Sequence, residues 1–190
     1  MNAFHRWYCR SGRWRRRLYD TILPGLFKDV DLGDDPLEIG PGPGITTDWL
    51  RQRVPHLTAI EIDRRLAASL EQRLAGSNVT VIEGDAAKMP FPDAAFSAAI
   101  SLTMLHHVPT RLQDRLLGEA CRVLKPGGVF VGIDSTPSFV WNLYHLFDDR
   151  FPVDPDGFGA RLERAGFGDV SVRRNPGRPG FSFRARRPPA

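Results

Sequence analysis

A glycine-rich turn at residues 40–44 constrains the fold more than any other feature of this sequence. The segment Leu37-Glu38-Ile39-Gly40-Pro41-Gly42-Pro43-Gly44 runs from a short apolar stretch into a helical pattern that begins at Thr46. Glycine lets a backbone turn tightly and approach a ligand closely. A strand, a glycine-rich turn and a helix in this order predict a strand–helix unit whose turn lies in a binding site at the carboxyl end of a sheet.

Apolar runs and helical patterns alternate along the chain. The apolar runs are continuous rather than alternately polar, which is typical of parallel strands covered on both faces. Near the end, two strand-like segments flank a short gap rich in Gly and Pro, which suits a hairpin better than a parallel crossover. We therefore expect an α/β fold with a mostly parallel, doubly wound sheet and an antiparallel last strand. The predicted strands are Pro36–Gly40, Leu57–Ile62, Val79–Glu83, Phe96–Leu102, Val129–Asp134, Asp169–Arg173 and Phe181–Ala185.

Four helices are expected between these strands. Each is marked by apolar residues at helical spacing and by a capping residue, a glycine or a proline at one end. They start at Thr46, ending near Pro55; at the capping residue Asp63, ending before Gly76; at Thr110, ending near Leu124; and at Phe158, ending at Ala165.

Two carboxylates follow the predicted strands at positions suited to a nucleotide-like cofactor. Glu61 ends the second strand, 21 residues after Gly40, where a carboxylate can accept hydrogen bonds from both ribose hydroxyls. Asp85 follows the third strand, where it can accept a hydrogen bond from an adenine amino group. The dinucleotide fingerprint requires glycine or alanine where Ile45 stands, and Glu38 is badly placed for a pyrophosphate but well placed for a cationic group. These residues favour a cationic, ribose-bearing cofactor over NAD.

With these motifs in order, the chain resembles the class I S-adenosylmethionine (SAM) dependent methyltransferases, closely over residues 36–134 and more loosely over 150–187. The matching segments follow one another at the spacing of that family, which makes the set specific although each is weak alone. They are Leu37–Gly44, Ala59–Asp63, Glu83-Gly84-Asp85-Ala86 with Met89-Pro90-Phe91-Pro92, Leu105-His106-His107-Val108, and Arg122-Val123-Leu124-Lys125-Pro126-Gly127-Gly128.

The resemblance implies a Rossmann-like, seven-stranded sheet of order 3-2-1-4-5-7-6 with an antiparallel last strand. It also implies SAM as cofactor and S-adenosyl-L-homocysteine as product. It places Glu38, Gly40, Gly42 and Gly44 around the methionine moiety, Glu61 on the ribose, and Asp85 with the Ala86 amide at the adenine. We also count Ser101, at the end of the fourth predicted strand, among the cofactor-binding residues. Ser97 stands where the family usually has an Asp that supports the glycine loop, and the stretch 135–156 is short where many relatives insert a substrate lid.

The expected reaction is an in-line methyl transfer to an O, N or C nucleophile of a small acceptor, and an aromatic or anionic acceptor suits the sequence. The protein then mainly positions the reactants, and a base is needed only when the nucleophile arrives protonated. His106 and His107, after the fourth strand, are the candidates for that base, and packing or helix capping is the alternative role. Adjacent histidines without a carboxylate set do not indicate a metal site, and we expect no metal.

Aromatic residues in two stretches are candidates for the acceptor pocket. The first 30 residues are expected to form a basic, aromatic helical segment that covers the pocket of a SAM-binding domain at 31–190. For Trp141, Tyr144 and His145, packing on the body of the protein is an equally good interpretation. The predicted pocket residues are Tyr8, Trp14, Trp141, Tyr144 and His145.

The basic charge of the chain is concentrated at its two ends. The net charge is +4, but residues 1–17 and 173–187 each hold six arginines and no acid, so the middle carries a net charge of −8. Such ends suit an anionic substrate, a phosphate surface, an acidic membrane contacted through the Arg-rich N-terminus, or the acidic body of the protein itself. Two cysteines, no apolar run of membrane-spanning length and no signal-like start predict a cytoplasmic protein with reduced thiols.

Three alternatives stay open at this point. A ribosomal RNA or other nucleic-acid methyltransferase would suit the basic ends, but Ser101-Leu102-Thr103-Met104 replaces the Asn-Leu-Pro-Tyr-type motif of such enzymes, so a nucleic-acid partner is disfavoured. The fold can also bind SAM for a non-methylating reaction or as a binding module. A NAD oxidoreductase is disfavoured by Ile45 and Glu38. A homodimer is compatible with the short lid region.

Overall fold

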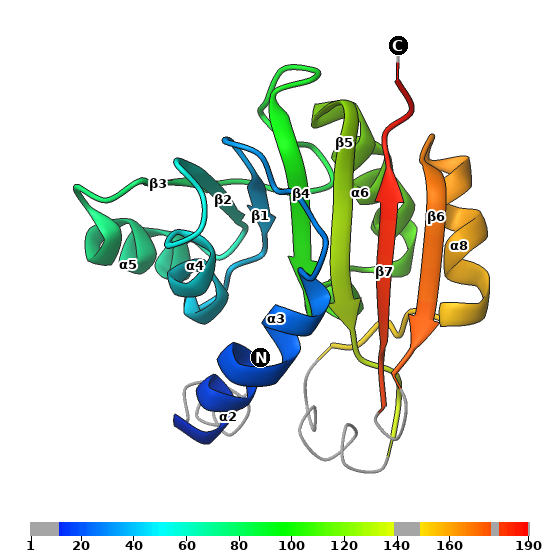
Figure 1. Cartoon of the computed structure of the whole chain (residues 1–190), viewed down its shortest axis with the longest axis horizontal. Coiled ribbons are helices and arrows are strands. Elements are labelled where there is room, and N and C mark those ends of the chain that lie inside the picture. Colours follow the sequence, from blue (N-terminus) through cyan, green and yellow to red (C-terminus); the bar gives the residue numbers. More distant parts are fainter. Residues whose placement is uncertain (1–11, 139–148, 176–178, 190) are drawn as a thin grey trace.

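The computed structural model describes residues 12–138, 149–175 and 179–189, and its strands form a seven-stranded sheet (Figure 1). The sheet order is β3-β2-β1-β4-β5-β7-β6, with β7 antiparallel to both of its neighbours. The sequence prediction of the strand order and of the reversed last strand is therefore confirmed. The strands are β1 (Leu37–Ile39), β2 (Leu57–Glu61), β3 (Val79–Glu83), β4 (Phe96–Leu102), β5 (Leu124–Asp134), β6 (Gly168–Arg174) and β7 (Phe181–Arg186).

The central strands are buried on both faces, as their continuous apolar sequences predict. Every residue of β1 and of β2 is buried, including Glu38 and Glu61. Their parallel pairing sets Glu38 beside Ala59 on one side and beside Ile100 on the other. The two carboxylates are therefore brought into the middle of the sheet, near its carboxyl edge.

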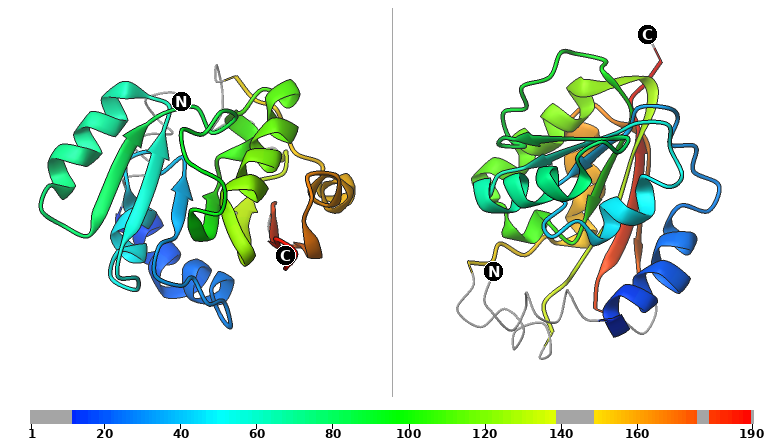
Figure 2. Two further views of the ribbon diagram at one scale, coloured as in Figure 1. Left: turned by 90° about the horizontal axis from the view of Figure 1, so that it is seen from above. Right: turned by 90° about the vertical axis from the view of Figure 1, so that its left-hand side faces the viewer.

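Helices cover the two faces of the sheet unequally (Figures 1 and 2). The helices α6 (Thr110–Val123) and α8 (Pro155–Arg164) lie behind β4, β5, β7 and β6 in Figure 1 and share one apolar core with them. In front lie the N-terminal helices, which share a second core with α4 (Ile45–Leu50). The helix α5 (Arg64–Leu74) packs on β2 and β3 at the other end of the sheet. No described helix lies in front of β6 and β7.

The N-terminal segment is one helical run with a wider turn in its middle. It comprises α2 (Gly12–Arg17), the π-helical turn η1 (Leu18–Ile22) and α3 (Leu23–Leu26). Leu18 and Leu23 are buried in the second core, and the Tyr19 hydroxyl donates to the carbonyl of Ile45, 2.8 Å away. The segment is thus fixed to the first residue of α4, next to the glycine-rich turn.

The largest differences from the predicted element boundaries are at α4, β5 and α8, and α4 ends at Leu50 rather than near Pro55. The strand β5 begins at Leu124 rather than Val129, because Leu124 pairs with Phe96 and a register shift then absorbs the Lys125–Gly128 segment. The helix α8 begins at Pro155 rather than Phe158, since the Asp154 side chain caps it by accepting from the Asp156 amide. The predicted cap of α5 is confirmed, with Asp63 accepting from the amides of Arg65 and Leu66.

In the part of the chain that the structure describes, every helix is too short or too polar to cross a membrane.

Two glycines provide opposite tests of this packing. A Cβ on Gly132 of β5 would collide with the Ser101 carbonyl and the Phe183 ring, whereas one on Gly118 of α6 meets no atom within 4 Å. We expect Gly132→Ala to lower the free energy of unfolding by about 2 kcal/mol or more, because the clash is with backbone. Gly118→Ala should raise it by up to about 1 kcal/mol through helix propensity. Chemical denaturation measures both, and equal effects of the two substitutions would contradict this packing.

Candidate functional site

The glycine-rich turn between β1 and α4 adopts a conformation that its three glycines make accessible. Gly40, Gly42 and Gly44 have φ values of +68°, +56° and +80°, the left-handed region that side chains rarely occupy. A Cβ on Gly40 would collide with Met104, and one on Gly44 with Leu70 and Arg73, whereas a Cβ on Gly42 would meet no atom within 4 Å. Gly40 and Gly44 are therefore required by packing as well as by backbone angle. Gly42 instead faces open space, beside which a ligand has room.

Glu38 anchors this turn from inside the protein. Its side chain is 1% exposed, and its two carboxylate oxygens accept hydrogen bonds from the Thr46 and Thr47 hydroxyls, the latter at 2.6 Å. Burial raises the pKa of Glu38 to about 7, against the lowering effect of both hydroxyls. The first turn of α4 is thereby tied to β1. The predicted contact between Glu38 and the amino group of a ligand stays a prediction.

Arg73 of α5 fixes the same turn from outside. Its guanidinium bonds both carboxylate oxygens of Asp48 at 2.8 Å and reaches the carbonyls of Pro43 and Gly44 at 3.4 and 3.3 Å. The turn is consequently held between a buried carboxylate and a partly exposed cation.

Glu61 lies at the end of β2 and faces the turn. One carboxylate oxygen accepts from the Gly42 amide at 2.9 Å and the other from the Asp63 amide at 3.0 Å. The residue is 6% exposed, but the next residue, Ile62, is 70% exposed, a large apolar side chain beside a carboxylate. This pair offers acceptors for hydroxyl groups next to an apolar surface.

Asp85 and Ala86 follow β3 at the same edge of the sheet. The Asp85 carboxylate accepts from the Ala87 amide at 2.8 Å and is exposed, while Ala86 is partly buried against the first core. The structure therefore leaves the predicted adenine-facing carboxylate open to solvent.

The end of β4 carries two unusual features. The Ser101 hydroxyl is buried and has no hydrogen-bond partner among the described residues. Thr103, two residues on, has a φ of +53°, a rare and strained conformation for a β-branched residue. Its amide donates to the Ile133 carbonyl at 2.8 Å, which holds the bend in place. An unsatisfied buried hydroxyl and local strain together are typical of a functional site.

A buried histidine–aspartate pair follows directly, in the 3-10 turn η2 (Leu105–His107). Nδ1 of His106 contacts one oxygen of Asp134, the last residue of β5, and the His106 amide donates to the other at 3.1 Å. His106 is 2% exposed and Asp134 is 1% exposed. The partly buried ring of His107 lies 4.2 Å from the His106 ring, centre to centre. The structure thus places the Asp134 carboxylate on the ring of His106, one of the two predicted bases.

Two neighbours hold this pair in place. Gln113 of α6 donates to the carbonyls of Leu105, Val108 and Phe151, so it clamps η2 to the segment before α8. On the other side, a Cβ on Gly180, the residue before β7, would lie 2.7 Å from the Asp134 carbonyl. The start of β7 thus packs directly on the backbone of the histidine's partner.

The structure describes one of the five predicted acceptor-pocket residues. Trp14 is partly buried against the second core, with α4 and the N-terminal helices. Tyr8, Trp141, Tyr144 and His145 lie outside the described residues, so their assignment stays a prediction.

Ser97, which stands where the family usually has an Asp, bonds residues before β1. The Ser97 hydroxyl donates to the Leu32 carbonyl at 2.6 Å and accepts from the Asp35 amide at 3.1 Å. Ser97 is near the start of β4, at the amino edge of the sheet. The residue fixes the approach to β1.

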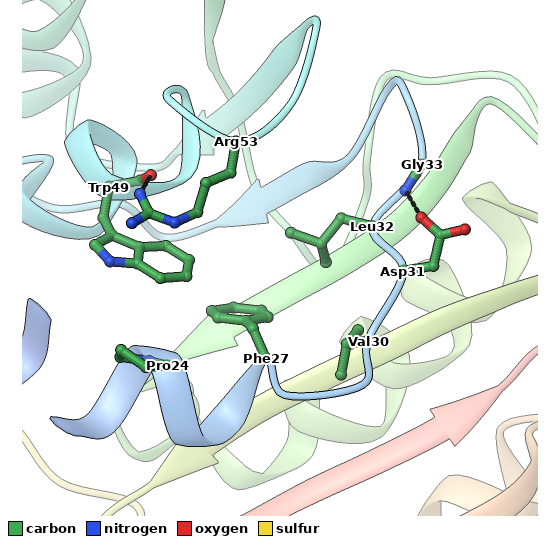
Figure 3. A pocket seen from close by; sticks show the side chains of 8 residues that line it. All are labelled: Pro24, Phe27, Val30, Asp31, Leu32, Gly33, Trp49 and Arg53. Atoms are coloured by element: carbon green, nitrogen blue, oxygen red, sulfur yellow. Dashed lines mark hydrogen bonds between the residues drawn. The ribbon is translucent and has the colours of Figure 1, made fainter. Parts of the chain in front are cut away.

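A pocket of about 360 Å³ also lies away from the carboxyl edge (Figure 3). The Arg53 guanidinium lies 3.6 Å above the Trp49 ring, which stacks on Phe27 with centres 5.4 Å apart. Its wall includes Leu32 and Gly33, which precede β1, so the pocket is separate from the glycine turn. It contains none of the predicted site residues.

Sequence reasoning missed four residues that the site depends on: Thr46 and Thr47 as partners of Glu38, Arg73 and Asp134. The last was accessible, because an acid at the end of β5 satisfies the same positional rule that pointed to Glu61. The others depend on helix packing, which no local pattern reveals.

These residues fit SAM. An open space beside Gly42, a carboxylate at Glu61, an exposed apolar side chain at Ile62 and an orphaned buried hydroxyl at Ser101 gather along one edge of the sheet. Each is a feature that a ribose-bearing, partly apolar cation would complement.

The buried Glu38 carboxyl makes stability depend on pH in a defined direction. Between about pH 4.5 and 7 the folded protein keeps a proton on Glu38 that the unfolded chain has released. The contribution of this group to the free energy of unfolding is therefore fully present below pH 4.5 and is lost as the pH rises through 7. The free energy of unfolding of Glu38→Gln, relative to that of wild type, should therefore rise by up to about 3 kcal/mol from acidic to mildly alkaline pH.

Denaturant unfolding across that pH range measures this difference. Glu83→Gln, at the exposed end of β3, is the matched control and should give a curve parallel to wild type. A Glu38→Gln curve that is also parallel to wild type would show that Glu38 does not titrate in this window.

Known proteins share this architecture and these motifs. A family model described as a methyltransferase domain matches residues 37–132. An uncharacterized methyltransferase of Mycobacterium tuberculosis is 31% identical over 131 residues, which are 67% of this chain and 64% of the relative. A rice chloroplastic 2-methyl-6-phytyl-1,4-hydroquinone methyltransferase is 29% identical over 175 residues, covering 83% of this chain and 52% of that protein. A probable ribosomal RNA small subunit methyltransferase A of Thermococcus onnurineus is 41% identical over 103 residues, 53% of this chain and 37% of the other.

The chain therefore spans about two thirds or less of the length of these relatives. Among solved structures, a protein of Pyrococcus horikoshii has a TM-score of 0.80 with 19% identity and covers 98% of this chain and 99% of its own, a likeness of fold. The family match, the strand order and the motifs agree, and the chain belongs to the class I SAM-dependent methyltransferases.

Proposed function

We propose that this chain transfers the methyl group of SAM to a nucleophilic atom of a small aromatic acceptor of the phenol or hydroquinone type. The observation that carries the proposal is the close packing of Gly40 against Met104. It sets the glycine turn directly against the segment that leads into the His106–Asp134 pair. Cofactor-facing and acceptor-facing residues are thus neighbours across one packing contact.

The cofactor side is assigned to the residues of the carboxyl edge. Glu61 would accept from the ribose hydroxyls, Ile62 would pack against the adenine ring, and Asp85 with the Ala86 amide would bind the edge of that ring. The glycine turn, Ser101 and Glu38 would surround the methionine moiety. The Glu61 carboxylate suits a cation, because it adds negative charge at this edge.

SAM supplies a methyl group that is already activated by its sulfonium charge. The protein's contribution is to align the acceptor and to remove its proton where it carries one. A proton on Nδ1 of His106 satisfies the Asp134 carboxylate and gives Nε2 the lone pair needed to take the proton of a phenol. His106 is almost fully covered in the structure, so the acceptor reaches it only by displacing the groups that cover it.

The acceptor class is inferred from the share of this chain that each relative matches. The rice hydroquinone methyltransferase aligns with 83% of this chain, whereas the ribosomal RNA enzyme aligns with 53%. Ser101-Leu102-Thr103-Met104 also lacks the residues with which nucleic-acid enzymes of this fold hold a flipped base. A small aromatic acceptor is therefore better supported than RNA.

The N-terminal 30 residues are assigned to covering the acceptor pocket. The bond from Tyr19 to Ile45 supports this role, because it fixes the helical segment beside the glycine turn. We place the enzyme in the cytoplasm on the grounds of its sequence.

The cofactor assignment predicts the effect of one substitution. Glu61→Ala should weaken SAM binding about 10-fold or more, because charge-assisted hydrogen bonds are lost. Isothermal titration with SAM, S-adenosyl-L-homocysteine and NAD measures this, and NAD should not bind.

Glu83→Ala is the control, since Glu83 pairs with Glu61 across the two strands but is exposed. It should leave SAM affinity unchanged. Unaltered affinity in Glu61→Ala would refute the ribose assignment, and absence of SAM binding by wild type would refute the proposed function.

The proposed role of the His106–Asp134 pair predicts a loss of turnover rather than of SAM affinity. With a phenolic acceptor found by screening for S-adenosyl-L-homocysteine release, His106→Gln and Asp134→Asn should each lower kcat about 100-fold, the usual contribution of a positioned base. SAM affinity should stay within a few-fold of wild type.

His107→Gln is the matched control because it alters the adjacent ring but not the pair with Asp134. Its kcat should fall much less. A larger loss in His107→Gln than in His106→Gln would reassign the base to His107.

A further inference from the structure

The C-terminal strands present arginines on the sheet face that no described helix covers. Phe181, Phe183 and Ala185 of β7 are buried in the core with α6 and α8, so the alternate residues of that strand point to the opposite face. These are Ser182, Arg184 and Arg186, and the strand pairing sets Arg173 of β6 beside Ser182. We call Arg173, Arg184, Arg186 and the nearby Lys28 the open basic face.

The charges of this face are not cancelled by partners. The Arg184 guanidinium donates to the carbonyls of Lys28 and Asp29 at 3.0 and 3.4 Å, and that of Arg186 to the Gly127 carbonyl at 3.0 Å. A carbonyl accepts a hydrogen bond but leaves the cation's formal charge in place. Among the described residues, none of the three arginines forms an ion pair, in contrast to Arg174 of the same hairpin, which pairs with Asp156 at 2.7 Å.

The open basic face continues toward the site. The N-terminal helices lie on the same side of the sheet (Figure 1), and Arg15, Arg16 and Arg17 of α2 are exposed there. The hydrogen bond from Tyr19 to Ile45 fixes that segment next to the glycine turn. Within the face, Arg186 lies at the amino edge of the sheet, where it pairs with Val129, and Arg173 lies nearer the carboxyl edge, opposite Ser182.

The chemistry of the face selects its partner. Single-stranded nucleic acid is bound by sheets through stacking on aromatic side chains, and the residues on this face are Ser and Arg. A second copy of the chain would bring like charges together. A bilayer with anionic headgroups requires only a broad array of cations, and each arginine near its surface adds to the attraction.

We propose that the open basic face, which extends from Arg186 at the amino edge of the sheet to Arg173 near its carboxyl edge, binds an anionic lipid bilayer. This extends the proposed function by giving access to an acceptor dissolved in the bilayer, and it rests on that function only for the acceptor. Binding to the surface itself requires neither SAM nor acceptor.

The test is co-sedimentation of the full chain with phosphatidylcholine vesicles, with and without phosphatidylglycerol, in the absence of SAM. The protein should sediment with the anionic vesicles only, and high salt should release it because the screening length falls to about 3 Å at 1 M. The double variant Arg173→Glu/Arg186→Glu should bind at least about 10-fold more weakly, since each reversal replaces attraction by repulsion.

A double variant at the opposite edge of the sheet, Arg64→Glu/Arg65→Glu on α5, has the same total charge and is the matched control. It should keep most of the wild-type binding, and thermal melting followed by circular dichroism should show that both variants are folded. Arg173→Gln/Arg186→Gln, which removes charge without reversing it, should give an intermediate loss.

Three results would overturn the proposal. One is failure of the wild type to bind anionic vesicles at low salt, and another is an equal loss in the two charge-reversed variants. The third is tighter binding of an RNA hairpin than of vesicles with the same dependence on Arg173 and Arg186, which would assign the face to nucleic acid. Because SAM binding is measured separately, none of these results bears on the methyltransferase assignment.

Discussion

The buried carboxylate of Glu38 is the interaction on which the site depends. A charge in the middle of a sheet is costly unless hydrogen-bonded, and here the Thr46 and Thr47 hydroxyls supply the bonds. These hydrogen bonds hold the start of α4 against β1, and the glycine turn connects the two. Glu61 then reaches the turn from β2, and Met104 packs on Gly40 from β4. Three strands thus converge on one loop because one acid has to be satisfied.

Local patterns in the sequence were sufficient for most of the fold. The strand order came from the family resemblance, while the reversed last strand followed also from the shortness of the gap between β6 and β7. Boundaries failed where tertiary pairing overrode a local signal: Pro126 and the glycines before Val129 indicate a turn, yet Leu124 pairs with Phe96 and extends β5. In the site, Glu61 and Asp85 could be located from strand ends alone. The partners Arg73 and Gln113 could not, because they come from the packed faces of helices whose rotation is set only in three dimensions.

The charge distribution gains meaning from the fold. The sequence shows two basic ends separated by 155 residues between Arg17 and Arg173, with no indication that they meet. The antiparallel placement of β7 and the packing of α3 bring Arg184 against the carbonyls of Lys28 and Asp29. In the described residues, Arg184 and Arg186 of the C-terminal end are therefore bound to the body through neutral carbonyls rather than through its acids. Docking on the acidic body, the simplest interpretation of the composition, holds for Arg174 and not for Arg173, Arg184 or Arg186.

The packing of Gly180 on Asp134 has an evolutionary consequence. The turn that joins β6 to β7 lies outside the regular elements, where insertions and deletions are tolerated without loss of the sheet. Because Gly180, the residue that leads from this turn into β7, packs on the backbone of Asp134, a change in the length or sequence of the turn is transmitted to the acceptor side while the cofactor residues on β1 and β2 stay untouched. A lineage could thus exchange one acceptor for another through a surface hairpin, and keep the same cofactor chemistry throughout.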